Sequence, residues 1–144
     1  AIVMNDTVFM FFRAEDNPKA YLGGRVSRIG LAWSIDGMNF NKFPEPVLYP
    51  DSSAYLKWDY PGGCEDPRVV KRPDGTYIMT YTAWNQDVAR LSIASSKNLK
   101  DWKKYGPALQ HAFEGKFLDT WSKSGSIVCK RIGDELIATK IIDK

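Results

Sequence analysis

The fold is decided by the stretch Arg28-Ile-Gly-Leu-Ala-Trp-Ser-Ile-Asp-Gly-Met-Asn-Phe40, because the chain repeats it. The second copy is Arg90-Leu-Ser-Ile-Ala-Ser-Ser-Lys-Asn-Leu-Lys-Asp-Trp102, which lies 62 residues further along. In each copy the mainly apolar run behind the Arg predicts a strand. The Ser-x-Asp-Gly or Ser-x-Asn that follows predicts a tight turn at the end of that strand, since these residues favour turns.

Two further pairs of similar segments extend the repeat. Residues 68–80 are matched by residues 127–139 at an offset of 59, and residues 9–14 precede the first copy as residues 78–83 precede the second. Each unit is therefore about 60 residues long and reads strand, turn, strand, loop, strand, turn, strand. Repeats of four strands at such a period are typical of β-propeller blades.

Turn residues stand at equivalent places in the units. Arg72-Pro-Asp-Gly75 has Pro and Gly where turn geometry favours them, and Asn5-Asp6 and Gly133-Asp134 occupy the matching positions. No long stretch has a 3.6-residue period, so we expect few helices. The sequence thus predicts an all-β protein.

The chain of 144 residues is short for a closed propeller. It holds about two and a half blades, roughly residues 1–60, 61–120 and 121–144, whereas propellers close with four or more. Residues 1–4 and 138–142 also read as strands that the ends of the chain interrupt. We therefore expect residues 1–144 to be part of one larger propeller domain. The alternative is a small complete β-sandwich.

Composition excludes several classes of function. The net charge of +3, from 20 Lys and Arg against 17 Asp and Glu, is too small to predict binding to nucleic acid or to an anionic membrane. The longest apolar run, residues 8–12, is too short to span a bilayer. Cys64 and Cys129 lack a metal-binding spacing and His111 is the single histidine, so no metal site is predicted. Any chemistry must rest on carboxylates, Lys, Arg and aromatic residues.

A pair of carboxylates stands where a strand is about to begin. Tyr60-Pro-Gly-Gly63 predicts a tight turn, and Cys64-Glu-Asp-Pro-Arg68 follows it into an apolar stretch. Because the residue before a Pro is restricted, we expect Asp66 to be extended and rigidly held, which is how a general acid is positioned. The simpler alternative is that Glu65 and Asp66 cap the turn and pair with Arg68.

Basic residues are predicted at the same rim of the repeat. Arg28 and Arg90 are equivalent, so both should open the same strand of successive blades, where two guanidinium groups suit an anion or sugar hydroxyls. Lys123 stands in the segment that matches residues 62–66 one repeat earlier. As alternatives, each Arg pairs with a neighbouring carboxylate and Lys123 is simply solvated.

Aromatic side chains offer candidates for sugar binding. Trp58, Trp84 and Asn85 suit stacking on a sugar or hydrogen bonding to it, and equally suit packing. His111 lies in a loop of mixed character, and a simple surface residue accounts for it without a catalytic role.

Several of these stretches occur in a fixed order: Phe12-Arg-Ala-Glu-Asp16, Arg28-Ile-Gly-Leu-Ala32 with Asp36-Gly37, Glu65-Asp-Pro-Arg68 and Tyr77-Ile-Met-Thr-Tyr-Thr-Ala83. In that order they resemble glycoside hydrolase family 130, which contains β-mannoside phosphorylases and β-mannosidases. The resemblance covers nearly the whole chain. It implies a five-bladed propeller and a complete member considerably longer than this chain.

The resemblance also implies roles for the matching positions. The family's general acid is the Asp of its Glu-Asp-Pro-Arg motif, here Asp66. The basic residues that hold phosphate in its phosphorylases match Arg90 and Lys123. Arg13, Glu15, Asp16 and Arg28 match positions around the subsite that holds mannose. With Glu65, Trp84 and Asn85 they make up the residues that we expect to bind substrate.

The reaction follows from the same resemblance. In the family the acid is thought to act through a sugar hydroxyl, and phosphate attacks from the opposite face to give α-mannose 1-phosphate with inversion. A phosphorylase needs cations to hold phosphate, whereas an inverting hydrolase needs a second carboxylate as base. Arg90 and Lys123 therefore favour phosphorolysis of a short β-mannoside, with inorganic phosphate as co-substrate and no other cofactor.

Two other functions remain open at this stage: an inverting β-mannosidase, and a propeller that binds glycans without catalysis. The sequence also leaves open the mannosidic linkage, the acceptor sugar, any homo-oligomer, and the compartment, whether cytoplasm or periplasm of a bacterium.

Overall fold

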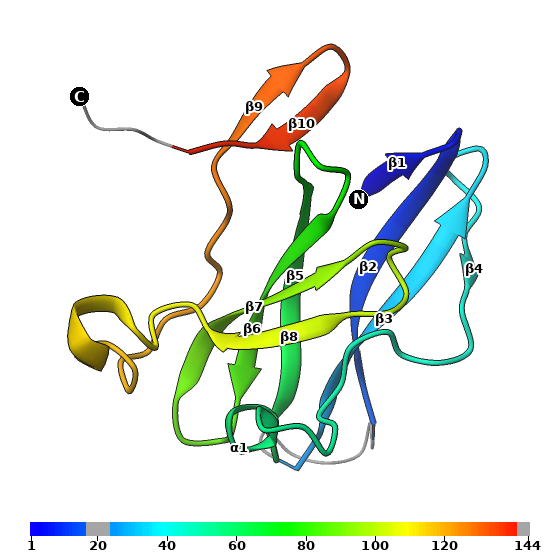
Figure 1. The fold of residues 1–144 in the computed structure, drawn as a ribbon. Helices are drawn as coiled ribbons and strands as arrows, with labels where there is room; N and C mark the ends of the chain where they lie inside the picture. The colour runs from blue at the N-terminus through cyan, green and yellow to red at the C-terminus, as the bar shows by residue number, and fades with distance from the viewer. Residues whose placement is uncertain (17–23, 141–144) are drawn as a thin grey trace.

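A computed structural model describes residues 1–16 and 24–140 (Figure 1). The described part of the chain is built mainly from strands: β1 (Ile2–Met4), β2 (Thr7–Glu15), β3 (Ser27–Ser34), β4 (Asn41–Lys42), β5 (Gly63–Lys71), β6 (Tyr77–Trp84), β7 (Ala89–Ser96), β8 (Lys103–Pro107), β9 (Cys129–Ile132) and β10 (Glu135–Ala138). The helical elements are α1 (Leu56–Asp59) and a 3₁₀ turn, η1 (Ala112–Gly115). The prediction of a mostly-β chain with few helices is confirmed.

The strands form two successive four-stranded antiparallel units. β1 to β4 pair in chain order, and so do β5 to β8. The units meet where β3 and β5 run parallel at Ser27 and Gly63, and the β9–β10 hairpin joins β5 at Ile137 and Lys71. The two copies of the repeated stretch fall on β3 and β7. How many such units close into a propeller, and where blades divide, stay predictions.

The two copies end in the same turn. The side chain that accepts the backbone hydrogen bonds is an aspartate in the first copy and an asparagine in the second. Asp36 Oδ1 accepts from the backbone N–H of Met38 and Asn39 at 2.9 and 2.8 Å, and its other oxygen accepts from the Asn39 amide at 2.8 Å. Asn98 takes the place of Asp36 in the second copy. Its Oδ1 accepts from two backbone N–H groups and its amide donates to Asp101 at 2.7 Å. The repeat is thus a repeat of hydrogen bonding as well as of apolar residues.

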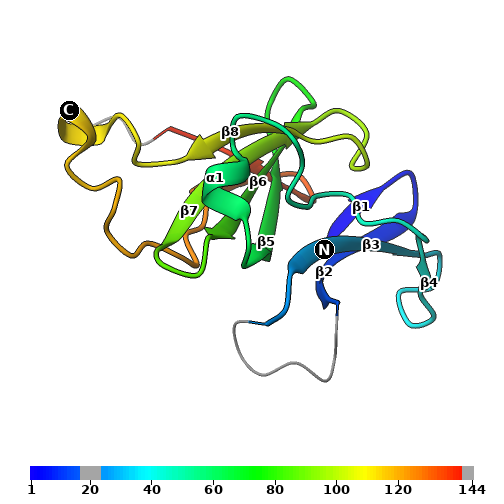
Figure 2. The ribbon, with the colours of Figure 1, turned by 90° about the horizontal axis from the view of Figure 1, so that it is seen from below.

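The hydrophobic core lies where the two units face each other. Alternate residues of β3, Ile29 and Leu31, are fully buried. Ile29 shares a cluster with Cys64, Met79 and Tyr81, and Leu31 shares one with Tyr77 and Leu99. Seen from below, β1–β4 lie beside β5–β8 (Figure 2). Side chains alternate across a strand, so the neighbouring positions of β3 point to the opposite face.

Several strand ends converge at one edge, the lower one in Figure 1. β2 ends there, β3, β5 and β7 begin there, and β6 ends there. We call this edge the rim; it comprises residues 13–16, 24–28, 62–66, 84–90 and 122–124. Within residues 1–16 and 24–140, no helix is long and apolar enough to cross a membrane.

Candidate functional site

The rim is fixed by a close approach of β5 to β3. Ser27 donates its backbone N–H to the carbonyl of Gly62 at 2.8 Å. Gly63 has φ +113°, and a Cβ there would lie 2.2 Å from the Ser27 carbonyl oxygen, so the contact requires glycine. A Cβ at Gly62 would likewise lie 2.4 Å from the Trp84 ring. The residues that follow in β5 are therefore held against β3 by backbone contacts.

Glu65 and Asp66 diverge because the strand carries a bulge. The β5–β6 register shifts between Glu65 and Arg68, and Asp66 has φ +50°, in the left-handed region. The expectation that Pro67 holds Asp66 in an extended conformation is therefore wrong: the extra residue of a bulge requires a different backbone geometry. Glu65 is buried, whereas the side chain of Asp66 is 36% exposed.

Arg13 of β2 links the carboxylates of the rim. Its Nη2 lies 2.9 Å from Glu65 Oε1 and 2.5 Å from Glu15 Oε1, and its Nη1 lies 3.9 Å from Asp66 Oδ1. Its Nε donates to Ser27 Oγ at 3.1 Å, and that hydroxyl donates to Glu65 Oε1 at 3.1 Å. The structure thus brings together three predicted residues and the predicted acid.

The pKa values of the two glutamates around Arg13 are shifted in opposite directions. Burial raises the pKa of Glu65 above its ordinary value, although Arg13 and the hydrogen bond from Ser27 oppose this rise. The hydrogen bond from Arg25 lowers the pKa of Glu15, and Arg13 adds to that effect. The Glu15 carboxyl therefore loses its proton at a lower pH than the Glu65 carboxyl does.

Asp16 and Arg28 form a second pair beside this cluster. Arg28 Nη1 lies 3.1 Å from Asp16 Oδ2, and the other Asp16 oxygen accepts from the backbone N–H of Val26 at 2.8 Å. Together with Glu15 and the Phe12 ring they line a hollow of about 440 Å³. Three predicted sugar-contacting residues therefore share one cavity.

Arg90 lies at the position equivalent to Arg28 but in different surroundings. Each is the second residue of its strand and stands opposite an alanine of the preceding strand, Ala14 or Ala83. Arg90 is only 3% exposed and packs over the Trp58 ring. All three of its guanidinium nitrogens donate to acceptors of the chain: Leu118 O at 2.9 Å, Val88 O at 3.1 Å and Asp119 Oδ1 at 2.6 Å.

Lys123 reaches the rim from the segment that follows η1. Its neighbour Ser122 forms a parallel bridge with Arg90, and Gly63 forms a parallel pair with Ser27 in the first unit, so both segments lie beside the start of a strand. The Lys123 side chain is exposed, and its positive charge offsets a small part of the rise that burial causes in the pKa of Glu65. Arg68 donates to the Ser124 carbonyl at 3.2 Å, which ties this segment to β5.

The remaining predicted residues have structural contacts. Trp84 packs on Gly62, and Asn85 Oδ1 accepts from the backbone N–H groups of Asp87 and Val88 at 3.2 and 2.9 Å, which closes the β6–β7 turn. His111 is exposed beside η1.

Sequence reasoning missed the polar partners of the site. Ser27 and Asp119 carry no motif, and nothing in the sequence indicates the buried pair of Asp59 and Lys104, whose charged atoms lie 2.5 Å apart. Such pairs form across 29 or 45 residues, which only the fold brings together. Among the described residues, no group of three or more His, Cys, Asp or Glu side chains is placed to hold a metal.

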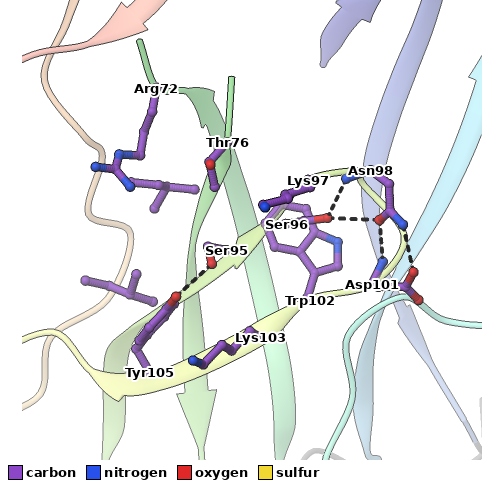
Figure 3. A pocket seen from close by; sticks show the side chains of 12 residues that line it. Arg72, Thr76, Ser95, Ser96, Lys97, Asn98, Asp101, Trp102, Lys103 and Tyr105 are labelled. Atoms are coloured by element: carbon purple, nitrogen blue, oxygen red, sulfur yellow. Dashed lines mark hydrogen bonds between the residues drawn. The ribbon is translucent and has the colours of Figure 1, made fainter. Parts of the chain in front are cut away.

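A hollow of about 870 Å³ lies at the opposite edge of the second unit (Figure 3). Its lining includes Arg72, Lys97, Trp102 and Tyr105, with Ser95 hydrogen-bonded to Tyr105 at 3.0 Å. None of the predicted site residues lines it. We therefore place the candidate site at the rim, where the carboxylates and guanidinium groups converge.

The chain is similar to known proteins in sequence and in structure. Residues 2–143 match the sequence profile of glycoside hydrolase family 130, described as beta-1,4-mannooligosaccharide phosphorylase. A curated relative, the 1,2-beta-oligomannan phosphorylase of Thermoanaerobacter sp. (strain X514), is 41% identical over 113 residues, which are 76% of this chain and 36% of the relative.

Solved structures match over almost the whole chain. One, reported under "The GH130 family of mannoside phosphorylases contains glycoside hydrolases that target beta-1,2 mannosidic linkages in Candida mannan", has a TM-score of 0.92 at 44% identity and covers 96% of this chain and 39% of its own. A glycosyl hydrolase from Bacteroides ovatus has a TM-score of 0.91 at 44% identity, again over 96% of this chain and 39% of its own.

The chain thus spans 36% of that curated relative and 39% of both solved structures. The profile match extends over nearly all of its residues, and it includes the motifs that place Asp66, Arg13 and Arg28 at the rim. The chain belongs to glycoside hydrolase family 130, the family of β-mannoside phosphorylases.

Proposed function

We propose that the protein cleaves short β-mannosides by inverting phosphorolysis, with Asp66 as the general acid and inorganic phosphate as the nucleophile. The observation that supports this most directly is the bulge at Asp66. It turns one carboxylate out to solvent beside a guanidinium group, while its neighbour Glu65 stays buried. A general acid must be within reach of the substrate, and the exposed Asp66 carboxyl meets this condition better than the buried Glu65 does.

The proposed step moves one proton and exchanges one bond. The Asp66 proton passes through a sugar hydroxyl to the departing glycosidic oxygen as the bond from C1 to that oxygen breaks. A phosphate oxygen forms the new bond to C1 from the opposite face, giving α-mannose 1-phosphate. Asp66 ends as a carboxylate and regains a proton from solvent before the next cycle.

The mannose whose C1 is attacked by phosphate is proposed to lie against the hollow lined by Glu15, Asp16 and Arg28. Trp84, Asn85 and Glu65 are proposed to complete the substrate contacts. A β-1,2 linkage is our first choice, because the curated relatives are a 1,2-beta-oligomannan phosphorylase and a beta-1,2-mannobiose phosphorylase. The wider fold proposed is a five-bladed propeller in which residues 1–144 are part of one catalytic domain.

Arg90 and Lys123 are proposed to bind the phosphate. Lys123 is exposed at the rim, where an ammonium group can meet an anion. Arg90 already holds one anion, the Asp119 carboxylate, whose side chain is 77% exposed. An exposed carboxylate can rotate away at low cost, and a phosphate oxygen can then take its place on Nη2.

A hydrolase is the second candidate, and one observation favours it. Every guanidinium nitrogen of Arg90 has an acceptor within the chain, so Arg90 can serve wholly as a structural residue that anchors the segment from Leu118 to Asp119. The solved structure with a TM-score of 0.92 comes from a report that the family also contains glycoside hydrolases. In that case water, activated by a base, replaces phosphate.

The variants Arg90→Ala and Lys123→Met test the phosphate site in the protein at its natural full length. A charge-assisted hydrogen bond contributes about 1.5–3 kcal/mol, so each variant should raise the KM for phosphate by about tenfold or more. The KM for the mannoside should change less than about threefold. If the mannoside KM rises and the phosphate KM does not, both residues belong to the sugar subsite and the phosphate assignment is wrong.

A further inference from the structure

We propose that the ring of Phe12 is the apolar floor on which the mannose of the substrate lies, in the hollow that Arg28 lines. This inference deepens the proposed function and rests on it, because it takes that hollow as the place of the mannose. The observation behind it is the contact between Phe12 and Gly30. A Cβ at position 30 would lie 2.4 to 2.9 Å from three atoms of the Phe12 ring.

The hollow is built on one face of the β2–β3 pair. Phe12 stands opposite Gly30, and Ala14 stands opposite Arg28. Because side chains alternate across a strand, these four residues share the face that points away from the buried Ile29, and all four line the hollow. In each pair one residue is small, which leaves space for the ring or the guanidinium group of the other.

The Phe12 ring reaches across from β2 to β3. Residues that stand directly opposite each other have Cβ atoms about 4.5–5.5 Å apart. Since the outer end of the ring lies where a Cβ of residue 30 would be, the ring extends over β3 instead of standing out from the sheet. Gly30 is buried beneath it, whereas Phe12 is half-buried. The ring is therefore a floor, with the hollow above it.

The wall of the hollow is the segment of residues 42–46, which the backbone of β3 holds in place. The N–H of Phe43 donates to the carbonyl of Leu31 at 2.9 Å, and the N–H of Val47 donates to that of Ile29 at 2.8 Å. The prolines at positions 44 and 46 also line the hollow, and proline has a fixed φ. The hollow is thus formed before any ligand binds.

The lining has the two kinds of surface that a sugar needs. Asp16 and Arg28 supply charged groups, and Phe12 with the prolines of the wall supplies apolar area. The volume of about 440 Å³ lies within the range of about 300–1,000 Å³ that is usual for ligand pockets. A pyranose carries hydroxyl groups around its edge and C–H groups on its faces. Its edge can therefore meet the charged groups while one face lies on the ring.

The other aromatic residues nearby are engaged elsewhere. Phe11 and Phe43 pack against the core clusters, whereas Phe12 belongs to neither cluster. Trp84, which the sequence suggested for stacking on a sugar, packs on Gly62 and does not line this hollow. Among the described residues, Phe12 is thus the aromatic side chain that combines a place in the hollow with freedom from the core.

The test removes the ring in the protein at its natural full length, with β-1,2-mannobiose as the probe. Phe12→Leu and Phe12→Met keep an apolar side chain but lose the flat ring. Both should raise the KM for mannobiose by about 3- to 10-fold, as expected for the loss of an aromatic contact, and leave the KM for phosphate within about twofold. Calorimetric titration of mannobiose in the Asp66→Asn background, without phosphate, should show the same rise in Kd.

Gly30→Ala tests the contact from the other side. The φ of Gly30 is not in the left-handed region, so alanine suits its backbone and only the Phe12 ring is in the way. The variant should push the ring into the hollow and raise the KM for mannobiose by about threefold or more. In the Phe12→Leu background it should add less than about twofold, because the ring is gone. As a control, Phe113→Leu changes a ring that is 77% exposed and outside the hollow, and should alter neither KM.

Two results would overturn the assignment of Phe12. One is a KM and a Kd for mannobiose within about 1.5-fold of the wild type in both Phe12 variants. The other is a loss confined to kcat. If unfolding in urea shows that Phe12→Leu folds poorly, Phe12→Met carries the comparison. A failure of the proposed function is seen separately, in the products. Free mannose released without phosphate would exclude phosphorolysis, but a raised KM would still place the sugar on Phe12, because hydrolysis binds the same mannose.

Discussion

Glu65 and Asp66 are adjacent in the chain, yet their carboxylates lie in opposite surroundings. One is buried among Ser27 and Arg13, and the other is turned outward by a bulge. The motif pointed to Asp66 through a family resemblance, and the turn before it indicated a fixed position. The positive φ of Asp66 and the hydroxyl of Ser27 could not be predicted, because both depend on contacts between β3 and β5.

Asp66→Asn is expected to abolish most of the catalysis while leaving mannoside binding intact. General acid catalysis contributes about 10²- to 10⁴-fold, so kcat should fall by at least about 10²-fold. Steady-state kinetics measures the rate, and calorimetric titration measures binding. A loss below about fivefold would exclude Asp66 as the acid and favour a glycan-binding protein without turnover.

Thr82 is a second residue whose environment gives a clear expectation. It stands opposite Glu65 in the β5–β6 pair and is fully buried, and its hydroxyl has no hydrogen-bond partner among the described residues. A buried hydroxyl without a partner destabilises the fold. Thr82→Val should therefore leave the free energy of unfolding unchanged or raise it by about 1 kcal/mol, as measured in urea. A loss of more than about 1 kcal/mol would mean that the hydroxyl is hydrogen-bonded in the protein.

At the scale of elements, the repeated turns after β3 and β7 offer an internal control. Backbone N–H and amide hydrogen bonds, those of Asn39 first, hold the pKa of Asp36 well below its ordinary range. Such a group stabilises the fold at pH values above its unfolded pKa of about 3.9, and loses that effect as the pH falls toward its folded pKa. Asn98 makes the matching contacts without titrating.

Asp36→Ala and Asn98→Ala should therefore differ in their pH dependence. The destabilisation by Asp36→Ala should be full at pH 6 and shrink progressively below about pH 4, whereas that of Asn98→Ala should stay constant. Unfolding in urea across this range measures both. Parallel curves for the two variants would show that the charge of Asp36 does not contribute to the turn.

The buried pair of Lys104 and Asp59 joins β8 to α1, directly before the turn that leads into β5. Lys104 also donates to the Tyr49 carbonyl at 2.6 Å, and Asp59 is completely buried. Removing one partner of a buried pair costs about 3–5 kcal/mol, whereas replacing both by apolar residues costs far less. Lys104→Met should therefore be much less stable than the double variant Asp59→Leu/Lys104→Met.

Equilibrium unfolding of both proteins measures this difference. The single variant is expected to lose at least about 3 kcal/mol, and the double variant to recover most of that loss. A single-variant cost below about 1 kcal/mol would show that Asp59 is not left as an uncompensated buried charge.

At the scale of the whole molecule, the repeat made the order of strands predictable. Residues 28–40 and 90–102 occupy β3 and β7 with their turns, and the chain belongs to the family that its motifs resemble. Sequence periodicity records which residues lie on one face, so it predicts strands well. It does not record which carboxylate meets which guanidinium group, and for that reason the surroundings of Arg13 and Arg90 had to come from the structure.

The most direct test of the proposed function is a product analysis with the protein at its natural full length. The protein is incubated with β-1,2-mannobiose, and separately with a β-1,4-linked mannoside, each with and without inorganic phosphate. We predict α-mannose 1-phosphate, formed only when phosphate is present and faster from the β-1,2 linkage. Free mannose released at a rate independent of phosphate would contradict phosphorolysis and identify a hydrolase.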